Sequence, residues 1–137
     1  MKKVILISFM LIQTICFGQN VSSTPTKLSI ISLIANAESY IEKKVMLKGF
    51  LNLEKHDTSI YLSKEDYINF NTKNAIFLSL SIDDMNRLEI GKMSKKYVSI
   101  IGVFYIPKFK NSQIQDNYIG ILKDIEHVEL IDKRKIK

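Results

Sequence analysis

The chain has 137 residues, 46% of them hydrophobic, which is enough for one domain with a modest core. The formal charge is +6, but two lysines at the start and four basic residues in the last five positions account for this excess. The other 14 basic and 14 acidic residues balance, which disfavours a nucleic-acid-binding domain, because such a domain needs a basic face. The single cysteine excludes an internal disulfide.

Residues 1–18 have the layout of a secretory signal peptide. Two lysines precede an apolar run over residues 4–12, and Cys16 and Gly18 stand at the −3 and −1 positions of a cleavage site. The run is too short for a membrane span. We therefore expect cleavage after Gly18 and a periplasmic or secreted mature protein without a transmembrane segment. Lipidation at Cys16 is less favoured, because the preceding residues resemble a lipobox poorly.

The mature chain is expected to begin with a polar linker over residues 19–28. Apolar residues then recur at helical spacing, which predicts a short amphipathic helix over residues 30–39 with Ser29 as its N-cap. Residues 45–53 alternate between apolar and polar side chains, as in a half-buried strand. A turn at 56–58 leads into a second strand over 59–62.

Two capping patterns follow. Ser63 and Asp66 predict a single helical turn before a third strand at residues 75–80, and Ser81 and Asp84 predict a short helix that ends near Gly91. The polar residues 64–67 and 72–74 are the densest polar group of the middle segment. We interpret them as a capped turn, and a ligand site at the same place is the alternative.

The last part of the chain predicts two strands. The first covers residues 97–106 and is followed by a polar loop at 108–117. The second covers 119–131, and its apolar positions change phase near Glu126 and His127, which predicts a bulge there. We assign the folded domain to residues 29–132 and a basic, solvated tail to 133–137, with contact to anionic lipid as the alternative for the tail.

A sequence pattern that occurs twice in the chain favours a small barrel. Residues 45–51 and 98–104 share the frame Val-x-(Leu/Ile)-x-Gly-x-(Leu/Phe), and a mid-strand glycine permits the sharp bend that a small barrel needs. Five strands, with a helix between the third and the fourth, predict a mainly β fold. The expected architecture is a five-stranded OB-fold-like barrel with a short N-terminal helix.

Four segments of the chain also resemble a family of small uncharacterised bacterial exported proteins with an OB-fold-like domain. The segments are residues 45–50, 61–67, 72–76 and 96–104. The resemblance covers residues 29–131 and implies a fold, not a reaction. The chain departs from the family at residues 108–117, where a stretch rich in glycine and histidine is expected.

No catalytic or metal-binding arrangement is visible in the sequence. The two histidines, His56 and His127, lack the spacing of metal ligands, and no cysteine accompanies them in the mature chain. There is no Gly-x-Ser-x-Gly elbow, and the five glycines form no phosphate-binding cluster. We expect a protein that is not an enzyme and has no cofactor.

The ligand-binding surface of an OB-fold is the face of its second and third strands, together with the loops after the first and fourth strands. On this chain, with His56 at the rim, that surface maps to Tyr61, Phe77, Tyr105, Lys108, Phe109 and Lys110. Aromatic rings beside lysines are suited to stacking on a base or a sugar, but also to an amphipathic surface or a dimer interface.

The sequence therefore predicts an exported, non-enzymatic module that binds a protein, a peptide or a small molecule. The main alternative is an OB-type binder of nucleic acid or oligosaccharide, and an enzyme subunit completed by a partner is the third hypothesis.

Overall fold

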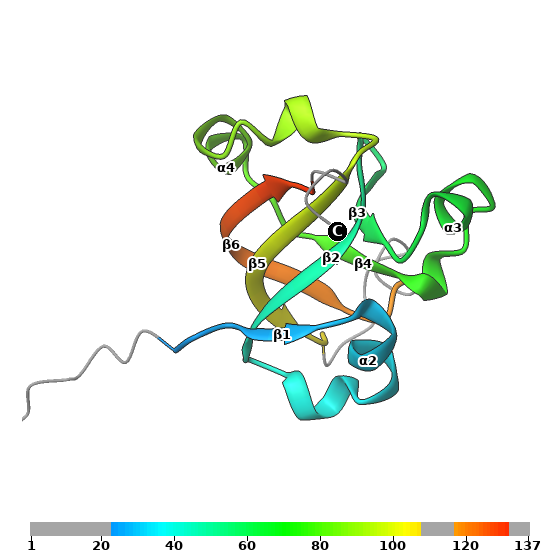
Figure 1. The fold of residues 1–137 in the computed structure, drawn as a ribbon, viewed down its shortest axis with the longest axis vertical. Coiled ribbons are helices and arrows are strands. Elements are labelled where there is room, and N and C mark those ends of the chain that lie inside the picture. Colours follow the sequence, from blue (N-terminus) through cyan, green and yellow to red (C-terminus); the bar gives the residue numbers. More distant parts are fainter. Residues whose placement is uncertain (1–22, 108–116, 132–137) are drawn as a thin grey trace, which may run out of the picture.

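The computed structural model describes residues 23–107 and 117–131. Within them, six strands form one mixed sheet in the order β1-β2-β3-β4-β6-β5. The strands are β1 (Thr26–Leu28), β2 (Lys44–Glu54), β3 (Asp57–Tyr61), β4 (Ala75–Leu78), β5 (Tyr97–Tyr105) and β6 (Ile121–Leu130). Because β2 also pairs with β5, the hydrogen bonds close a ring from β2 through β3, β4, β6 and β5 (Figure 1). The predicted mainly β architecture is confirmed.

The helical elements are short and lie around the ring of strands (Figure 1). They are α2 (Ile30–Ala35), η1 (Ala37–Tyr40), α3 (Lys64–Ile68), η2 (Thr72–Asn74), α4 (Ile82–Arg87) and η3 (Ile90–Met93). Among residues 23–107 and 117–131, no helix has the length and apolar character needed to cross a membrane. The α4 and η3 segments connect β4 to β5, where a short helix was predicted.

The sixth strand corrects the sequence prediction, because β1 lies within the expected linker. Thr26 pairs with Val45 and Leu28 with Leu47, in parallel orientation. The hairpin partner β3 pairs only with β2 residues 50–54 and leaves the edge of the first half of β2 open. The three residues of β1 occupy that edge. So short a strand has no recognisable alternation, which explains why the sequence did not reveal it.

Strand pairing explains the sequence pattern that residues 45–51 and 98–104 share. β2 and β5 run antiparallel, so Val45 lies opposite Gly102 and Gly49 lies opposite Val98. Neither glycine has room for a side chain: a Cβ atom on Gly49 would come within 2.4 Å of the Tyr61 carbonyl oxygen. At Gly102, the Ile125 Cδ1 atom would be 2.8 Å away. Each glycine therefore allows another strand to pass close by.

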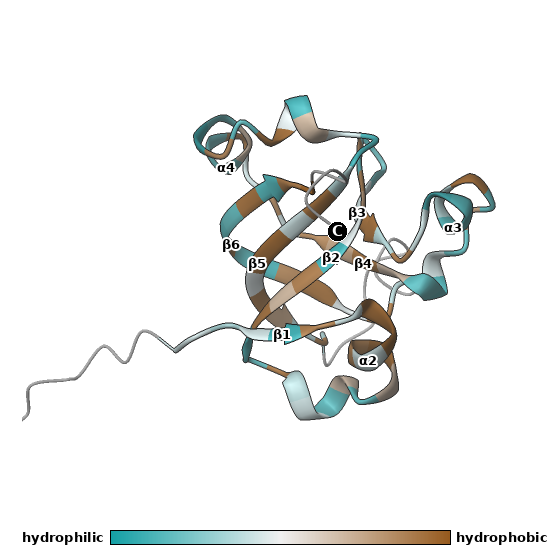
Figure 2. Ribbon diagram, in the orientation of Figure 1, coloured by the Kyte–Doolittle hydropathy of each residue, from teal (hydrophilic) through white to brown (hydrophobic). Residues whose placement is uncertain are grey.

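The main core fills the inside of the ring. Inward side chains of all the ring strands contribute to it, and Ile30 and Leu33 of α2 and Ile90 of η3 close it. In Figure 2 the hydrophobic colour accordingly concentrates on the strands and on α2.

A second, smaller cluster lies on the outer face of β2 and contains Phe50, Tyr61 and Ala75. The alternation predicted for β2 therefore holds only in its first half, because Phe50 and Asn52 on the outer face are buried as well.

Most predicted boundaries and caps are confirmed within a few residues. Ser29 caps α2, but the predicted single helix is divided, because Asn36 leaves helical geometry before η1 begins. Ser63 accepts a hydrogen bond from the Asp66 amide at 3.0 Å, as expected of an N-cap. Ser81 and Asp84 form a complete capping box.

The predicted irregularity in the last strand occurs a few residues earlier than expected. Ile101 pairs with His127 but Val103 pairs with Lys123, so the register shifts across residues 124–126 of β6. Asp124 adopts a φ of 50°, which accommodates the extra residues. Beyond the shift, Val128 is buried, but Leu130 at the strand end is largely exposed.

Candidate functional site

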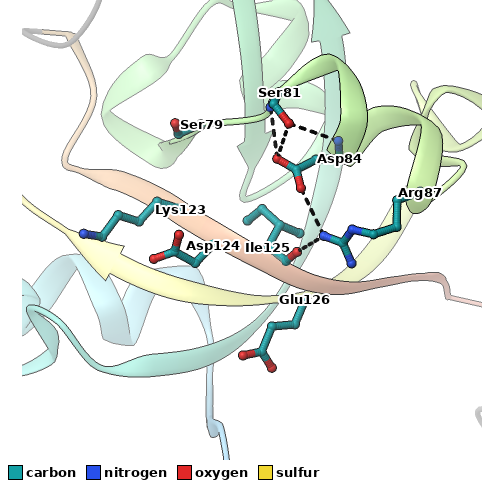
Figure 3. A pocket seen from close by; sticks show the side chains of 8 residues that line it. All are labelled: Ser79, Ser81, Asp84, Arg87, Lys123, Asp124, Ile125 and Glu126. Atoms are coloured by element: carbon teal, nitrogen blue, oxygen red, sulfur yellow. Dashed lines mark hydrogen bonds and ion pairs between the residues drawn. The ribbon is translucent and has the colours of Figure 1, made fainter.

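Two hollows have contrasting linings. The larger of the two lies between α4 and β6, and part of its polar lining is engaged in the protein's own contacts. It has a volume of about 580 Å³. The Arg87 Nη2 atom donates to Asp84 Oδ1 at 3.0 Å and to the Ile125 carbonyl oxygen at 2.8 Å (Figure 3). Hydrogen bonds from Ser81 hold the pKa of Asp84 below its ordinary value. This groove therefore serves to attach α4 to the irregular part of β6.

The smaller hollow, about 330 Å³, lies at the tip of the β2–β3 hairpin, and we call it the hairpin-tip hollow. The hairpin supplies one wall, the loop after α3 supplies the opposite wall, and residues near the start of β6 complete it. Its lining residues are Glu54, Lys55, His56, Asp57, Tyr61, Phe70, Thr72 and Tyr118. Unlike the α4–β6 groove, it exposes mainly apolar atoms.

Asp57 lies at the floor of this hollow and is saturated with hydrogen bonds. Its Oδ2 atom accepts from Asn52 Nδ2 and from the Tyr61 hydroxyl, both at 2.8 Å. Its Oδ1 atom accepts from Ser59 Oγ at 2.5 Å and from the Tyr118 hydroxyl at 2.6 Å. Four donors fill the acceptor capacity of the carboxylate, so Asp57 organises the floor.

Burial, together with the hydrogen bond to Asp57, raises the pKa of Tyr61 from 10.0 to about 12. The same two causes raise the pKa of Tyr118. Both hydroxyls therefore stay protonated at neutral pH and donate to the carboxylate.

This shift predicts an alkaline loss of stability. Below pH 10 Tyr61 is protonated in both the folded and the unfolded chain, so its full contribution to the free energy of unfolding is present. Above pH 10 the tyrosine of the unfolded chain loses its proton first, which favours unfolding. We expect the free energy of unfolding to fall as the pH rises from 10 towards 12. Urea unfolding at several pH values measures this loss, and the variant Tyr61→Phe should have a shallower pH dependence. Equal slopes for both proteins would contradict the assignment.

A second network of polar side chains, centred on Lys95, lies beside Asp57 and its partners. Lys95 Nζ donates to Asn52 Oδ1 at 2.5 Å and to Glu54 Oε1 at 2.7 Å, and it also contacts the Tyr67 hydroxyl. The hydrogen bond from Lys95 is the main reason why the pKa of Glu54 lies below its ordinary value. The carboxylates at this end of the molecule are thus engaged with the protein's own donors.

Aromatic side chains surround the polar floor. The Phe50 ring lies 5.5 Å from that of Tyr67, and the Tyr61 and Tyr67 rings lie 5.6 Å apart. On the other side, the Phe77 and Tyr118 rings lie 5.7 Å apart. Such pairs help to fix the rings of Tyr61 and Tyr118, the two tyrosines that line the hollow.

Phe70 is the most exposed aromatic residue of the hollow. Its side chain is 75% exposed, and its φ of 53° lies in the left-handed region that bulky residues avoid. The Phe70 amide donates to the Tyr67 carbonyl oxygen at 3.1 Å, which holds the turn.

The polar segment that precedes strand β4 supports this turn through Asp66. The Asp66 Oδ1 atom accepts from Asn71 Nδ2 at 3.0 Å and from Asn74 Nδ2 at 2.8 Å. Burial alone would raise the pKa of Asp66, but hydrogen bonds from Ser63 and the two asparagines outweigh it and lower the pKa. The capped-turn interpretation of residues 64–67 and 72–74 thus agrees with the contacts.

Of the three predicted ligand-binding residues that the structure describes, only Tyr61 lines the hollow. Tyr61 is there but fully buried, so it forms part of the floor and offers no exposed ring face. Phe77 packs against Tyr118, and Tyr105 lies under Lys123 Nζ, 4.8 Å from its ring centre, away from the hollow. Lys108, Phe109 and Lys110 lie outside the described residues.

Asp57, Phe70 and Tyr118 were not found from the sequence. Asp57 was assigned to a turn, whereas strand β3 begins there and the turn is confined to residues 55–56. The alternation of Asp57, Ser59 and Tyr61 on one face of that strand was the available signal. His56 is exposed at the rim, as expected. Within the described ranges no group of three His, Cys, Asp or Glu residues could hold a metal ion.

Comparison with known protein families, curated proteins and solved structures finds no match to this chain.

Proposed function

We propose that this chain is an exported, non-enzymatic binding module of the OB type, and that it binds its ligand in the hairpin-tip hollow. The observation that carries the proposal is the combination of a saturated polar floor with an exposed aromatic wall. Because the floor groups bond to one another, none of them is poised as a nucleophile or a general base. Among the described residues, no side chain covers the opening of the hollow, and its mainly apolar lining can receive a ligand.

The strand arrangement supports the OB-type part of this proposal. The ring order β2-β3-β4-β6-β5, with the parallel pair β4–β6 and a short helix between β4 and β5, is the arrangement expected of that fold. The hollow lies beside the turn that follows the first strand of the ring and beside Tyr118, which precedes the last strand. These are the places where OB-folds bind ligands.

Export is the remaining part of the proposal and rests on residues 1–18. Determining the N-terminal sequence of the protein from cell fractions tests it. We expect a mature chain that begins at Gln19 in the periplasmic or extracellular fraction, and an intact leader in the cytoplasm would contradict export.

Removing the exposed ring should weaken binding without unfolding the protein. We expect Phe70→Ala to weaken the binding of apolar compounds at least about tenfold and to change the free energy of unfolding by less than about 0.5 kcal/mol, because the side chain is exposed. NMR titration of the isotope-labelled protein with a library of small apolar compounds measures this effect. Shifts should cluster at His56, Phe70, Thr72 and Tyr118.

Ile68→Ala is the matched control, because Ile68 is a 56% exposed apolar residue that lies two positions before Phe70, at the end of α3, and does not line the hollow. It should bind the same compounds as the unmodified protein does. Shifts that cluster away from the hollow, or equal losses in both variants, would refute the proposed site.

A further inference from the structure

We propose that the hairpin-tip hollow is selective for a ligand that joins one aromatic ring to a carboxylate. The ring would lie against Phe70 and Tyr118, and the carboxylate would face Lys55 and His56. This inference rests on the proposed function and specifies the chemical class of the ligand.

The hydrogen-bond acceptors of the hollow are largely used by the protein itself. Both oxygens of Asp57 accept two hydrogen bonds each. The Glu54 Oε1 atom accepts from Lys95 at 2.7 Å and from the Tyr67 hydroxyl at 3.2 Å. A ligand that presented only donors would therefore find few partners, and a cationic ligand would compete with Lys95 for Glu54.

The donors at the rim, in contrast, have no partner among the residues that the structure describes. Lys55 and His56 form the exposed turn of the β2–β3 hairpin, and both line the hollow. Their side chains make no hydrogen bond or ion pair with residues 23–107 or 117–131. Thr72 on the opposite wall also has a hydroxyl without a protein partner in those ranges. Free donors beside engaged carboxylates match a ligand that carries an acceptor, and a carboxylate is the strongest common one.

The aromatic wall accounts for the ring. The left-handed backbone at Phe70 is unfavourable for a bulky residue and is supported by the hydrogen bonds of the Asp66 turn. The Tyr118 ring is held by Phe77 at 5.7 Å and through its hydroxyl by Asp57. The Tyr118 ring, which is already held, loses little conformational freedom when a ligand binds.

The size of the hollow limits the ligand to one ring. Its volume of about 330 Å³ is at the lower end of the range of about 300–1,000 Å³ that is typical of ligand pockets. An oligosaccharide or an oligonucleotide would extend well beyond it. Two sources share the expected chemistry: a small free aromatic acid, and the C-terminal aromatic residue of a polypeptide.

N-acetyl-L-phenylalanine is a suitable probe, and NMR titration of the full protein gives its dissociation constant. N-acetyl-L-phenylalaninamide lacks the charge and N-acetylglycine lacks the ring, so each tests one half of the inference. We expect the amide to bind about five- to tenfold more weakly than the acid, and N-acetylglycine not to bind measurably. Because these comparisons use the unmodified protein, they do not depend on the folding of a variant.

Lys55→Met should weaken the binding of the acid about fivefold and leave that of the amide unchanged, whereas Lys64→Met is the matched control and should change neither. Equal affinities for acid and amide would overturn the carboxylate assignment but leave the proposed site intact. Binding of both probes outside the hollow would overturn the site as well.

A peptide with a free C-terminal phenylalanine distinguishes the two sources. Affinity about tenfold tighter than that of the free acid, lost on C-terminal amidation, would support a polypeptide ligand. Equal affinities would support a small aromatic acid.

Discussion

Replacing Gly49 with alanine is expected to lower the free energy of unfolding by about 3 kcal/mol or more. The new Cβ atom would lie 2.4 Å from the Tyr61 carbonyl oxygen and 2.7 Å from Ile60 Cγ1. The carbonyl belongs to the backbone of β3, so relief requires the two strands to move apart, and overpacking of this kind typically costs about 1–3 kcal/mol or more. Urea unfolding, followed by circular dichroism, measures the loss.

Gly91→Ala is the matched control for this experiment. No atom lies within 4 Å of a Cβ built on Gly91, and its φ is not positive. We expect a change below about 0.5 kcal/mol, and a slight gain is compatible with the reduced freedom of the unfolded chain. If Gly49→Ala were as stable as Gly91→Ala, the close approach of β2 and β3 would be wrong.

Replacing Asp57 with alanine should have the second large effect, a loss of about 3–5 kcal/mol. The substitution removes the acceptor for Tyr61, Tyr118, Ser59 and Asn52, and the last two residues are fully buried. Buried donors without partners are costly, at about 1–3 kcal/mol each. The floor of the hollow should loosen at the same time, so the probes that bind there should bind more weakly. Urea unfolding and the NMR titration measure the two effects.

Asp83→Ala provides the comparison for Asp57→Ala. Asp83 is exposed in the first turn of α4, where its contribution is limited to a favourable interaction with the helix dipole. We expect a loss below about 1 kcal/mol. Asp57→Asn keeps the shape of the side chain and one acceptor oxygen, so its loss of unfolding free energy should lie between those of Asp57→Ala and Asp83→Ala. A cost for Asp57→Ala no greater than that for Asp83→Ala would refute the role of Asp57 as an organising group.

The elements of this fold were largely predictable because their signals are local. The alternation in residues 45–53, the caps at Ser29, Ser63 and Ser81, and the phase change in the last strand each depend on neighbours in the sequence. All of them lie within a few residues of the observed positions. The strand at Thr26–Leu28 was not predicted, because these residues become a strand by pairing with the open edge of β2. That edge is a feature of the assembled sheet and not of the local sequence.

The site was much less predictable than the fold. Aromatic residues of the expected binding face were chosen by strand position, but position did not reveal that Tyr61 is buried by its neighbours on the outer face of β2. Phe70 has no local sequence signal, because its exposure depends on a left-handed turn held by Asp66 and two asparagines. The density of polar residues around that turn is visible in the sequence, whereas the exposed ring that the turn presents is not.

The amino-acid sequence by itself determined the mainly β class, the helix caps and the mid-strand position of glycine in two strands. It also led to the expectation of export. Each of these depends on the order of adjacent residues. Only the tertiary structure decided which side chains share the hairpin-tip hollow, since Asp57 and Tyr118 are 61 positions apart and meet through strand pairing. Burial also decided the chemistry of Tyr61 and Tyr118, because both hydroxyls donate to the Asp57 carboxylate and form a closed floor. The binding surface that we propose therefore consists of the side chains around that floor.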